Sequence, residues 1–231
     1  MPTILAIETS ADVASVALLR GEKIYTRQAD VAKTHSEAIL PLVQGVLAEA
    51  GTRLEECDAL AFGSGPGSFT GVRTAAGVVQ GLAFGSGRMV IPVVTLQAMA
   101  QACHARTGAA DVLAILDARM GEVYWAQYRY DNGWREVVVP TLSAPAAVRP
   151  QGAVQACGNG LLAHAAAFAE EAFAAGALVD VMPHALQIAQ LARTAHARGD
   201  MLAAHDAQPL YLRNKVALTT SERQAKAGAA A

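Results

Sequence analysis

Charged residues are scarce in this chain. They make up 16% of its 231 residues, against roughly 25% in an average soluble protein. The 18 basic and 20 acidic residues leave a net charge of −2 and form no long runs. This balance excludes a basic surface that would hold nucleic acid by electrostatic attraction, so we expect any role near RNA to run through another molecule. The hydrophobic share of 53% instead indicates a surface that is apolar in places and covered by a permanent partner.

The sequence shows no pattern typical of a disulfide scaffold, a membrane span or a leader segment. Cys57, Cys103 and Cys157 are far apart and odd in number, which predicts reduced thiols and not a disulfide scaffold. No apolar run approaches the roughly 18 residues that span a bilayer, and Met1 leads into an apolar strand without a basic segment. We therefore expect a cytoplasmic protein without membrane attachment.

The common signatures of metal and nucleophile chemistry are absent. The six histidines form no HxxxH, HxH or HExxH pattern, and no two cysteines form CxxC. No G-x-S-x-G elbow occurs, and Ser64 and Ser68 lie in a glycine-rich loop where only a base distant in the sequence could activate them. These absences argue against a metalloenzyme or a serine hydrolase.

The apolar pattern predicts strands and helices that recur in the same order. The elements of the first half are expected at residues 4–7, 14–19, 23–28, 35–50, 59–62, 70–84, 89–94 and 96–104. The helix at 35–50 opens with the capping box Thr34-x-x-Glu37 and stops at Gly51. Pro41 predicts either a kink in this helix or a start near Leu40.

The second half begins by repeating the first strand. Residues 112–115 are again apolar and again precede an acid, Asp117 in place of Glu8. The later elements are expected at 123–130, 135–139, 153–157, about 160–175 and 183–199, with a hairpin at 131–133. We therefore predict a duplicated α/β fold with lobes at 1–106 and 107–218. The polar segment at 219–231 has nothing to bury and is expected to be a flexible tail.

Polar turns follow the first strand of each half. Their backbone N–H groups and hydroxyls could hold phosphate across a cleft between the lobes. The alternative is a pair of turns capped by polar residues, which we favour because residues 8–13 lack glycine and no GxxxxGK[ST] motif follows. We interpret the following residues as a vestigial nucleotide loop: Glu8, Thr9, Ser10, Asp117, Gly158 and Gly160.

Glycines mark the segment between residues 63 and 85. The loop at 63–71 contains four glycines and a proline, so it either receives an anion at the helix N-terminus or packs its backbone on a neighbour. In the helix that follows, Gly77, Gly81 and Gly85 recur every four residues and form a stripe without side chains. Each costs about 1 kcal/mol relative to alanine. The stripe therefore indicates close packing, either on the protein's own sheet or on another chain.

Three motifs resemble the TsaB (YeaZ) family. They are residues 4–10, 65–73 and 117–124, and the resemblance continues through Tyr211-Leu212-Arg213-Asn214 to cover nearly all of the chain except the tail. It implies a duplicated fold like that of actin, Hsp70 and sugar kinases. It also implies an accessory subunit of the enzyme TsaD, which with the ATPase TsaE transfers a threonylcarbamoyl group to the adenosine beside the anticodon in tRNAs that read codons beginning with A.

The resemblance also implies what the chain lacks. TsaD is a paralogue that holds its metal with a His-x-x-x-His pair, and Thr95 and Met99 align with those histidines. Neither side chain can replace an imidazole. The resemblance thus implies a non-catalytic subunit with no cofactor of its own, ATP and metal on the partner subunits, and tRNA bound only through the complex. The alternatives are a small-molecule kinase or nucleotide hydrolase using the cleft, and a glycoprotease-like peptidase, which would need a metal site.

The two helices at 35–50 and 70–85 are the predicted partner surface. The glycine stripe would let another helix approach, and a similar helix pair from the paralogue would complete a four-helix packing. A homodimer through the same surface is expected when the paralogue is missing. The residues assigned to this surface are Leu40, Val43, Leu47, Thr70, Arg73, Thr74, Gly77, Gly81 and Gly85.

Overall fold

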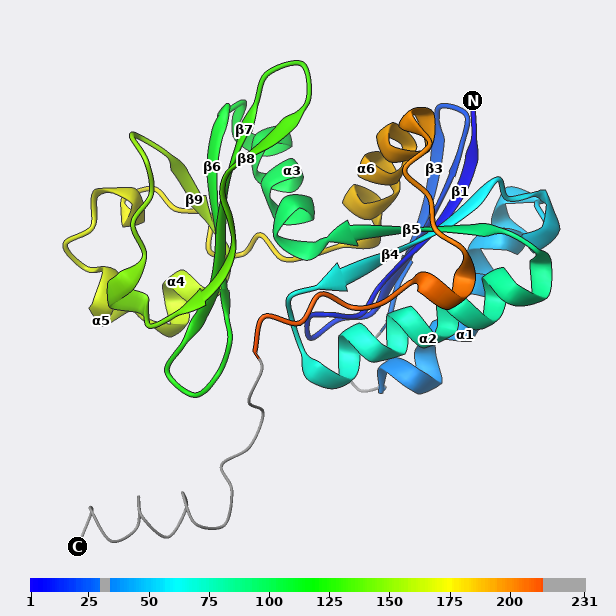
Figure 1. The fold of residues 1–231 in the computed structure, drawn as a ribbon, viewed down its shortest axis with the longest axis horizontal. Helices are drawn as coiled ribbons and strands as arrows, with labels where there is room; N and C mark the ends of the chain where they lie inside the picture. The colour runs from blue at the N-terminus through cyan, green and yellow to red at the C-terminus, as the bar shows by residue number, and fades with distance from the viewer. Residues whose placement is uncertain (30–33, 214–231) are drawn as a thin grey trace, which may run out of the picture.

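A computed structural model describes residues 1–29 and 34–213. The chain forms two lobes, each built around a mixed β-sheet (Figure 1). The tail predicted at 219–231 lies outside the described residues. In the described part, no helix is both long enough and apolar enough to cross a membrane.

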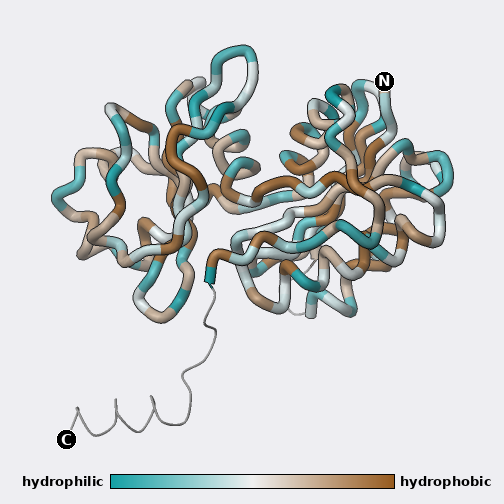
Figure 2. The backbone as a smooth tube through the Cα atoms, in the orientation of Figure 1, coloured by the Kyte–Doolittle hydropathy of each residue, from teal (hydrophilic) through white to brown (hydrophobic). Residues whose placement is uncertain are grey.

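The first sheet has the order β3-β2-β1-β4-β5. Its strands are β1 (Thr3–Glu8), β2 (Ser15–Arg20), β3 (Lys23–Gln28), β4 (Ala59–Gly65) and β5 (Met89–Val94). The first three form an antiparallel meander, as predicted, and β4 runs parallel to both β1 and β5. Side chains alternate along β1, so Leu5 and Ile7 face one apolar cluster while Ile4 and Ala6 face another. Both faces of the sheet are therefore covered, and Figure 2 shows hydrophobic residues concentrated in these strands.

Helices from opposite ends of the sequence cover the two faces of the first sheet. Helices α1 (His35–Ala50) and α2 (Phe69–Ser86) lie on one face, and α6 (Ala185–Arg198) lies on the other (Figure 1). The capping box forms: Thr34 donates its backbone N–H and its hydroxyl to Glu37 Oε2, at 3.3 and 2.5 Å. This box fixes the start of α1 at His35, so the alternative start near Leu40 is wrong and Pro41 lies inside the helix.

The second sheet repeats the first. Its strands are β6 (Asp111–Asp117), β7 (Val123–Tyr130), β8 (Trp134–Ser143) and β9 (Gln155–Cys157), in the order β8-β7-β6-β9. Strand β6 corresponds to β1 of the first sheet. It runs antiparallel to β7, the next strand, and parallel to β9, the strand that precedes the glycine turn. Helix α3 (Thr95–Thr107) covers one face of this sheet. The predicted duplicated α/β fold is confirmed.

Two parts of the second-half prediction are wrong. The alanine-rich segment forms only the short helices α4 (Gly160–Ala163) and α5 (Ala165–Phe168) and a 3-10 turn at Ala172–Ala174, because the backbone leaves helical geometry at His164. Its buried anchors, Leu161, Phe168 and Phe173, are seven and five residues apart, and a spacing of five does not keep them on one helical face.

The lobe boundary also needs correction. Helix α6 lies in the segment assigned to the second lobe, yet its buried residues Ala185, Ile188 and Ala192 pack on the first sheet. Conversely, α3 lies before the boundary except for its last residue and packs mainly on the second sheet. The halves thus exchange one helix each, which a division of the sequence into consecutive lobes cannot represent.

Candidate functional site

The polar residues of the turn after β1 are buried and bonded within the protein. Glu8 is fully buried, its Oε1 accepts the backbone N–H of Ser10, and its Oε2 has no hydrogen-bond partner. Removal from water raises the pKa of Glu8 above its ordinary value of 4.5. Thr9 donates its hydroxyl to the carbonyl of Gly71 at 2.7 Å. Because Glu8 and Thr9 are 0% exposed, neither can reach a ligand in the cleft.

The glycine-rich loop packs closely over this turn. A Cβ at Gly63 would overlap the Glu8 carboxylate, and a Cβ at Gly71 would overlap the main chain of Thr9. A Cβ at Gly67 would lie 2.6 Å from the Cβ of Ser10. The glycines of this loop are therefore explained by close packing, one of the two alternatives left open by the sequence.

The second lobe has an equivalent arrangement at the end of β6. Asn159 Oδ1 accepts the backbone N–H of Asp117 at 3.0 Å, and Asp117 Oδ1 lies 3.2 Å from Nε2 of His164. A Cβ at Gly158 would overlap the Ile115 carbonyl, and one at Gly160 would lie 2.7 Å from the Ile115 side chain. In both lobes, glycines allow the chain to pack where the proposed nucleotide loop would need open backbone N–H groups.

A cleft of about 740 Å³ lies between these two turns. It brings Ser10 and Asp117 to one cavity, while Glu8, Thr9, Gly158 and Gly160 do not line it. Arg73, at the start of α2, also lines the cleft, with its guanidinium 3.4 Å from the Phe69 ring centre and 4.6 Å from that of Tyr211. The described residues contain no group of three or more His, Cys, Asp or Glu side chains that could hold a metal ion.

The segment after α6 connects the lobes across this cleft. Its Leu210 donates a backbone N–H to the Ser64 carbonyl of the first lobe at 2.7 Å. Arg213 then reaches the second lobe, where it donates to Glu122 Oε2 at 2.6 Å and to the Ala118 carbonyl at 3.0 Å. The sequence did not predict this contact of Arg213, because a contact with a residue 91 positions away leaves no local signal.

Thr95 and Met99, the residues aligned with the paralogue's histidines, have structural contacts. The Thr95 hydroxyl accepts the backbone N–H of Gly65 at 3.0 Å and so fixes the glycine loop. Met99 is fully buried in the second lobe, where its methyl group fills the space left by the missing side chain of Gly158. Both residues are part of the packing between the strands and α3, with no opening for a metal.

The glycine stripe of α2 faces away from the protein's own sheet. Gly77, Gly81 and Gly85 are all exposed, and a Cβ at any of them would meet no atom within 4 Å. Their neighbour Phe84 is 86% exposed. Packing on the protein's own sheet, one of the two alternatives for this stripe, is therefore wrong.

The other residues assigned to this surface differ in how far they are exposed to solvent. Leu40 is 48% exposed and Thr70 and Arg73 are exposed, whereas Leu47 and Thr74 are half-buried. Val43 is only 3% exposed, because it shares the inner face of α1 with Ile39 and Val46. Val43 therefore cannot contribute to a surface. The sequence prediction did not assign Phe84 to this surface, because a large apolar side chain can equally point into the core.

Comparison with known proteins identifies close relatives. Residues 22–228 match the family model described as "TsaD: tRNA N6-adenosine threonylcarbamoyltransferase". The tRNA threonylcarbamoyladenosine biosynthesis protein TsaB of Haemophilus influenzae is 40% identical over 93% of this chain and 94% of its own length. The Escherichia coli protein of the same name is 39% identical over 93% and 96%. The structure of YeaZ from Pseudomonas aeruginosa superposes with a TM-score of 0.85 at 38% identity, over 92% of this chain and 100% of that one.

Proposed function

Since the chain belongs to the TsaB family, within the wider TsaD family whose model it matches, we propose that it works in tRNA threonylcarbamoyladenosine biosynthesis as a non-catalytic subunit that binds and orders a TsaD-type enzyme. The names of the relatives support the pathway. The accessory role rests on the arrangement of this chain's own residues.

The exposed glycine stripe of α2 carries the proposal. An 18-residue helix whose glycines at 77, 81 and 85 face open space is destabilised by about 1 kcal/mol at each of them. Such a face lets another helix approach until the two backbones are nearly in contact. Phe84, next to the stripe on α2, and Leu40 on α1 are both exposed. Each would lose its contact with water if a partner covered it, which favours association. A helix pair of similar shape, such as the paralogue would supply, fits this surface.

The packing at the family's catalytic position supports a non-catalytic role. Thr95 and Met99 are buried and engaged within the fold, and neither is a ligand for a hard or borderline metal. In this proposal ATP and metal belong to the TsaD-type and TsaE-type partners, and tRNA is met only within the complex. When the TsaD-type partner is missing, the same surface would pair two copies of this chain.

A kinase or nucleotide hydrolase remains the second candidate because the interlobe cleft has a volume suited to a small ligand. The turns at Glu8 and Asp117 argue against this function, because their backbone N–H groups already bond within the chain and few remain for phosphates. A peptidase has no supporting residues in the described part of the chain.

The proposal is tested with Gly81→Leu in cells that co-express the TsaD homologue of the same organism. Leucine at this exposed position has room in the free chain. In a tight helix contact it would clash, and the free energy of association would become less favourable by about 1–3 kcal/mol. Ala105→Leu, at an exposed position of α3, is the matched control. We expect Gly81→Leu to weaken the complex in analytical ultracentrifugation by tenfold or more and to lower threonylcarbamoyladenosine in tRNA, measured by mass spectrometry.

A thermal melt separates folding from association in this experiment. Both variants should melt within a few degrees of the wild type. Full association of Gly81→Leu with the TsaD homologue would place the interface elsewhere, and unchanged tRNA modification despite a lost complex would exclude the accessory role.

A further inference from the structure

Two asparagines of this chain precede a glycine, and the structure places them in opposite surroundings. Asn132-Gly133 lies at the tip of the hairpin between β7 and β8, and Asn159-Gly160 lies at the start of α4. An asparagine before glycine is open to attack of the following backbone nitrogen on its side-chain amide, because glycine has no side chain to shield that nitrogen. Neither the relatives' names nor the proposed function gives Asn132 a role.

The hairpin tip leaves the attacking nitrogen open. Asn132 is exposed, and its backbone is left-handed with a φ of 53°. The Gly133 N–H has no hydrogen bond to any described residue, and a Cβ at Gly133 would meet no atom within 4 Å. A backbone bond of 3.0 Å from the Asp131 N–H to the Gly133 carbonyl closes the tip. With so few contacts to break, the tip can rotate until the Gly133 nitrogen reaches the side chain of Asn132.

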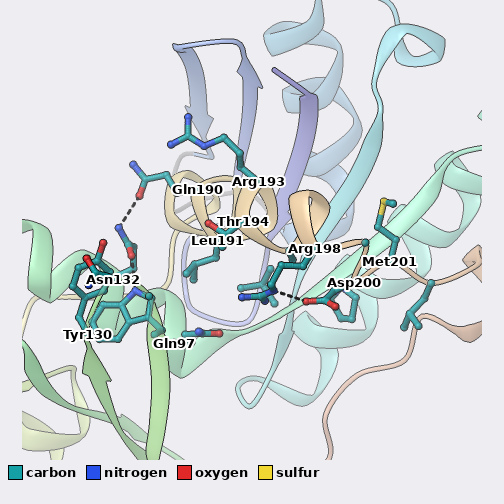
Figure 3. Close-up of a pocket in the computed structure, with 18 residues that line it drawn as sticks. Gln97, Tyr130, Asn132, Gln190, Leu191, Arg193, Thr194, Arg198, Asp200 and Met201 are labelled. Atoms are coloured by element: carbon teal, nitrogen blue, oxygen red, sulfur yellow. Dashed lines mark hydrogen bonds and ion pairs between the residues drawn. The ribbon is translucent and has the colours of Figure 1, made fainter.

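The side-chain amide of Asn132 is also open to water. Its Nδ2 donates to Asp131 Oδ1 at 3.4 Å, a long bond to a neighbour that is itself exposed. Figure 3 shows Asn132 and Tyr130 on the hairpin side of a cavity of about 650 Å³, which α6 lines on the opposite side. The amide nitrogen can therefore leave into solvent.

Asn159 is held in the opposite way. Its Oδ1 accepts the Asp117 N–H at 3.0 Å, and its own carbonyl accepts the Ala163 N–H at 2.9 Å. Gly160 is buried, and a Cβ there would lie 2.7 Å from the Ile115 side chain. Attack on the Asn159 amide would break these bonds and rotate a closely packed backbone, so it requires the turn to open first.

We propose that Asn132 is a site of spontaneous deamidation through a cyclic imide, and that the fold protects Asn159 from the same reaction. The Gly133 nitrogen attacks Cγ of Asn132 and loses its proton to solvent. The new C–N bond closes the ring while the bond from Cγ to Nδ2 breaks, and Nδ2 leaves as ammonia. Water then opens the ring at one of its two carbonyl groups and produces an aspartyl or an isoaspartyl residue, without any oxidation or reduction.

The two products change the hairpin to different extents. Each places a carboxylate where the wall of the cavity had a neutral amide. The isoaspartyl form also inserts the Cβ atom into the main chain of the tip, next to the stacked rings of Tyr130 and Trp134, whose centres are 5.2 Å apart. Trp134 Nε1 donates to Gln101 of α3 at 2.7 Å, so a change at the tip would be transmitted to α3.

The test follows the purified full-length chain over time at neutral and at mildly alkaline pH, with its tryptic peptides analysed by mass spectrometry. Trypsin releases residues 130–135, with Asn132, separately from the long peptide that contains Asn159. The same chain unfolded in guanidinium chloride gives the rate of each pair without protection by the fold. Asn132→Gln is the matched control, since glutamine would have to close a larger ring and does so more slowly.

We expect the 130–135 peptide of the folded chain to gain the mass that corresponds to –OH in place of –NH₂, and to gain it faster at the higher pH. It should contain both the aspartyl and the isoaspartyl form. Asn159 should react at least about tenfold more slowly than Asn132 in the folded chain, because its turn must open first, and at a comparable rate in the unfolded chain.

Several results would overturn the proposal. One is an unchanged 130–135 peptide in the folded chain, and another is an equal rate at Asn132 and Asn159 there. An aspartyl product without the isoaspartyl form would show direct hydrolysis and no imide. A mass gain that persists in Asn132→Gln would place the reaction at another residue. The α1–α2 surface and its association are not involved in any of these results.

Discussion

Alanine substitutions should divide the glycines of α2 into those that the fold requires and those that it does not. A Cβ at Gly77 or Gly81 meets no atom within 4 Å, whereas a Cβ at Gly71 overlaps the main chain of Thr9. Alanine in an exposed helix interior is favoured over glycine by about 0.5–1 kcal/mol. The double variant Gly77→Ala/Gly81→Ala should therefore raise the free energy of unfolding by about 1–2 kcal/mol, since the two sites share no partner.

The same change at Gly71 should act in the opposite direction. The atom that a new Cβ would overlap is a main-chain carbonyl, which cannot move aside by changing a side-chain rotamer. We expect Gly71→Ala to lower the free energy of unfolding by about 1–3 kcal/mol. Two substitutions of identical chemistry in one helix then differ in sign because of their surroundings alone.

Guanidinium chloride unfolding and thermal melts measure both effects. For a chain of this length, 1 kcal/mol corresponds to about 2–4 °C in Tm, so the double variant should melt about 2–8 °C higher. The melts are repeated at several protein concentrations, because a homodimer would make Tm depend on concentration. Loss of stability in the dilute double variant would show that the stripe packs within the chain, and a neutral Gly71→Ala would contradict the close contact with Thr9.

Three further results are expected. Because the pKa of Glu8 is raised, the folded chain holds this proton more tightly than the unfolded chain, and the resulting stability is present below pH 4.5 and lost as the pH rises through the raised value. Glu8→Gln should remove this fall, by up to about 1.4 kcal/mol per pH unit, and a wild-type pH profile in the variant would contradict the assignment. Arg213→Met should lower stability by about 1–2 kcal/mol and widen the distance distribution between spin labels on the two lobes; unchanged distances would mean that Arg213 does not hold the lobes. The isolated chain should not hydrolyse ATP above background, and turnover that disappeared in Asp117→Asn would favour the hydrolase alternative.

Local signals in the sequence predicted the elements best. The ranges of β3, β5 and β7 agree with the prediction at both ends, and the capping box with Gly51 fixed α1. Each of these depends on residues within a few positions of one another. The return of α6 to the first sheet depends on residues far apart in the sequence. Ala185 and Ser15, for example, are 170 positions apart, and the Ser15 hydroxyl accepts the Ala185 N–H at 3.0 Å. No periodicity within α6 distinguishes one sheet from the other.

The two helices of the α1–α2 surface differ in what their sequences reveal. In α1 the spacing of Ile39, Val43 and Val46 marks one apolar face, and this periodicity alone indicates that Val43 is buried. In α2, apolar residues occur on all sides, from the buried Val79 to the exposed Phe84, so the orientation of the stripe depends on the sheet. With Val43 in the core, the exposed surface consists mainly of α2. A partner that approaches this surface would therefore contact the backbone at Gly77, Gly81 and Gly85 more than side chains of α1, which is why substitutions in the stripe are the sharpest test of association.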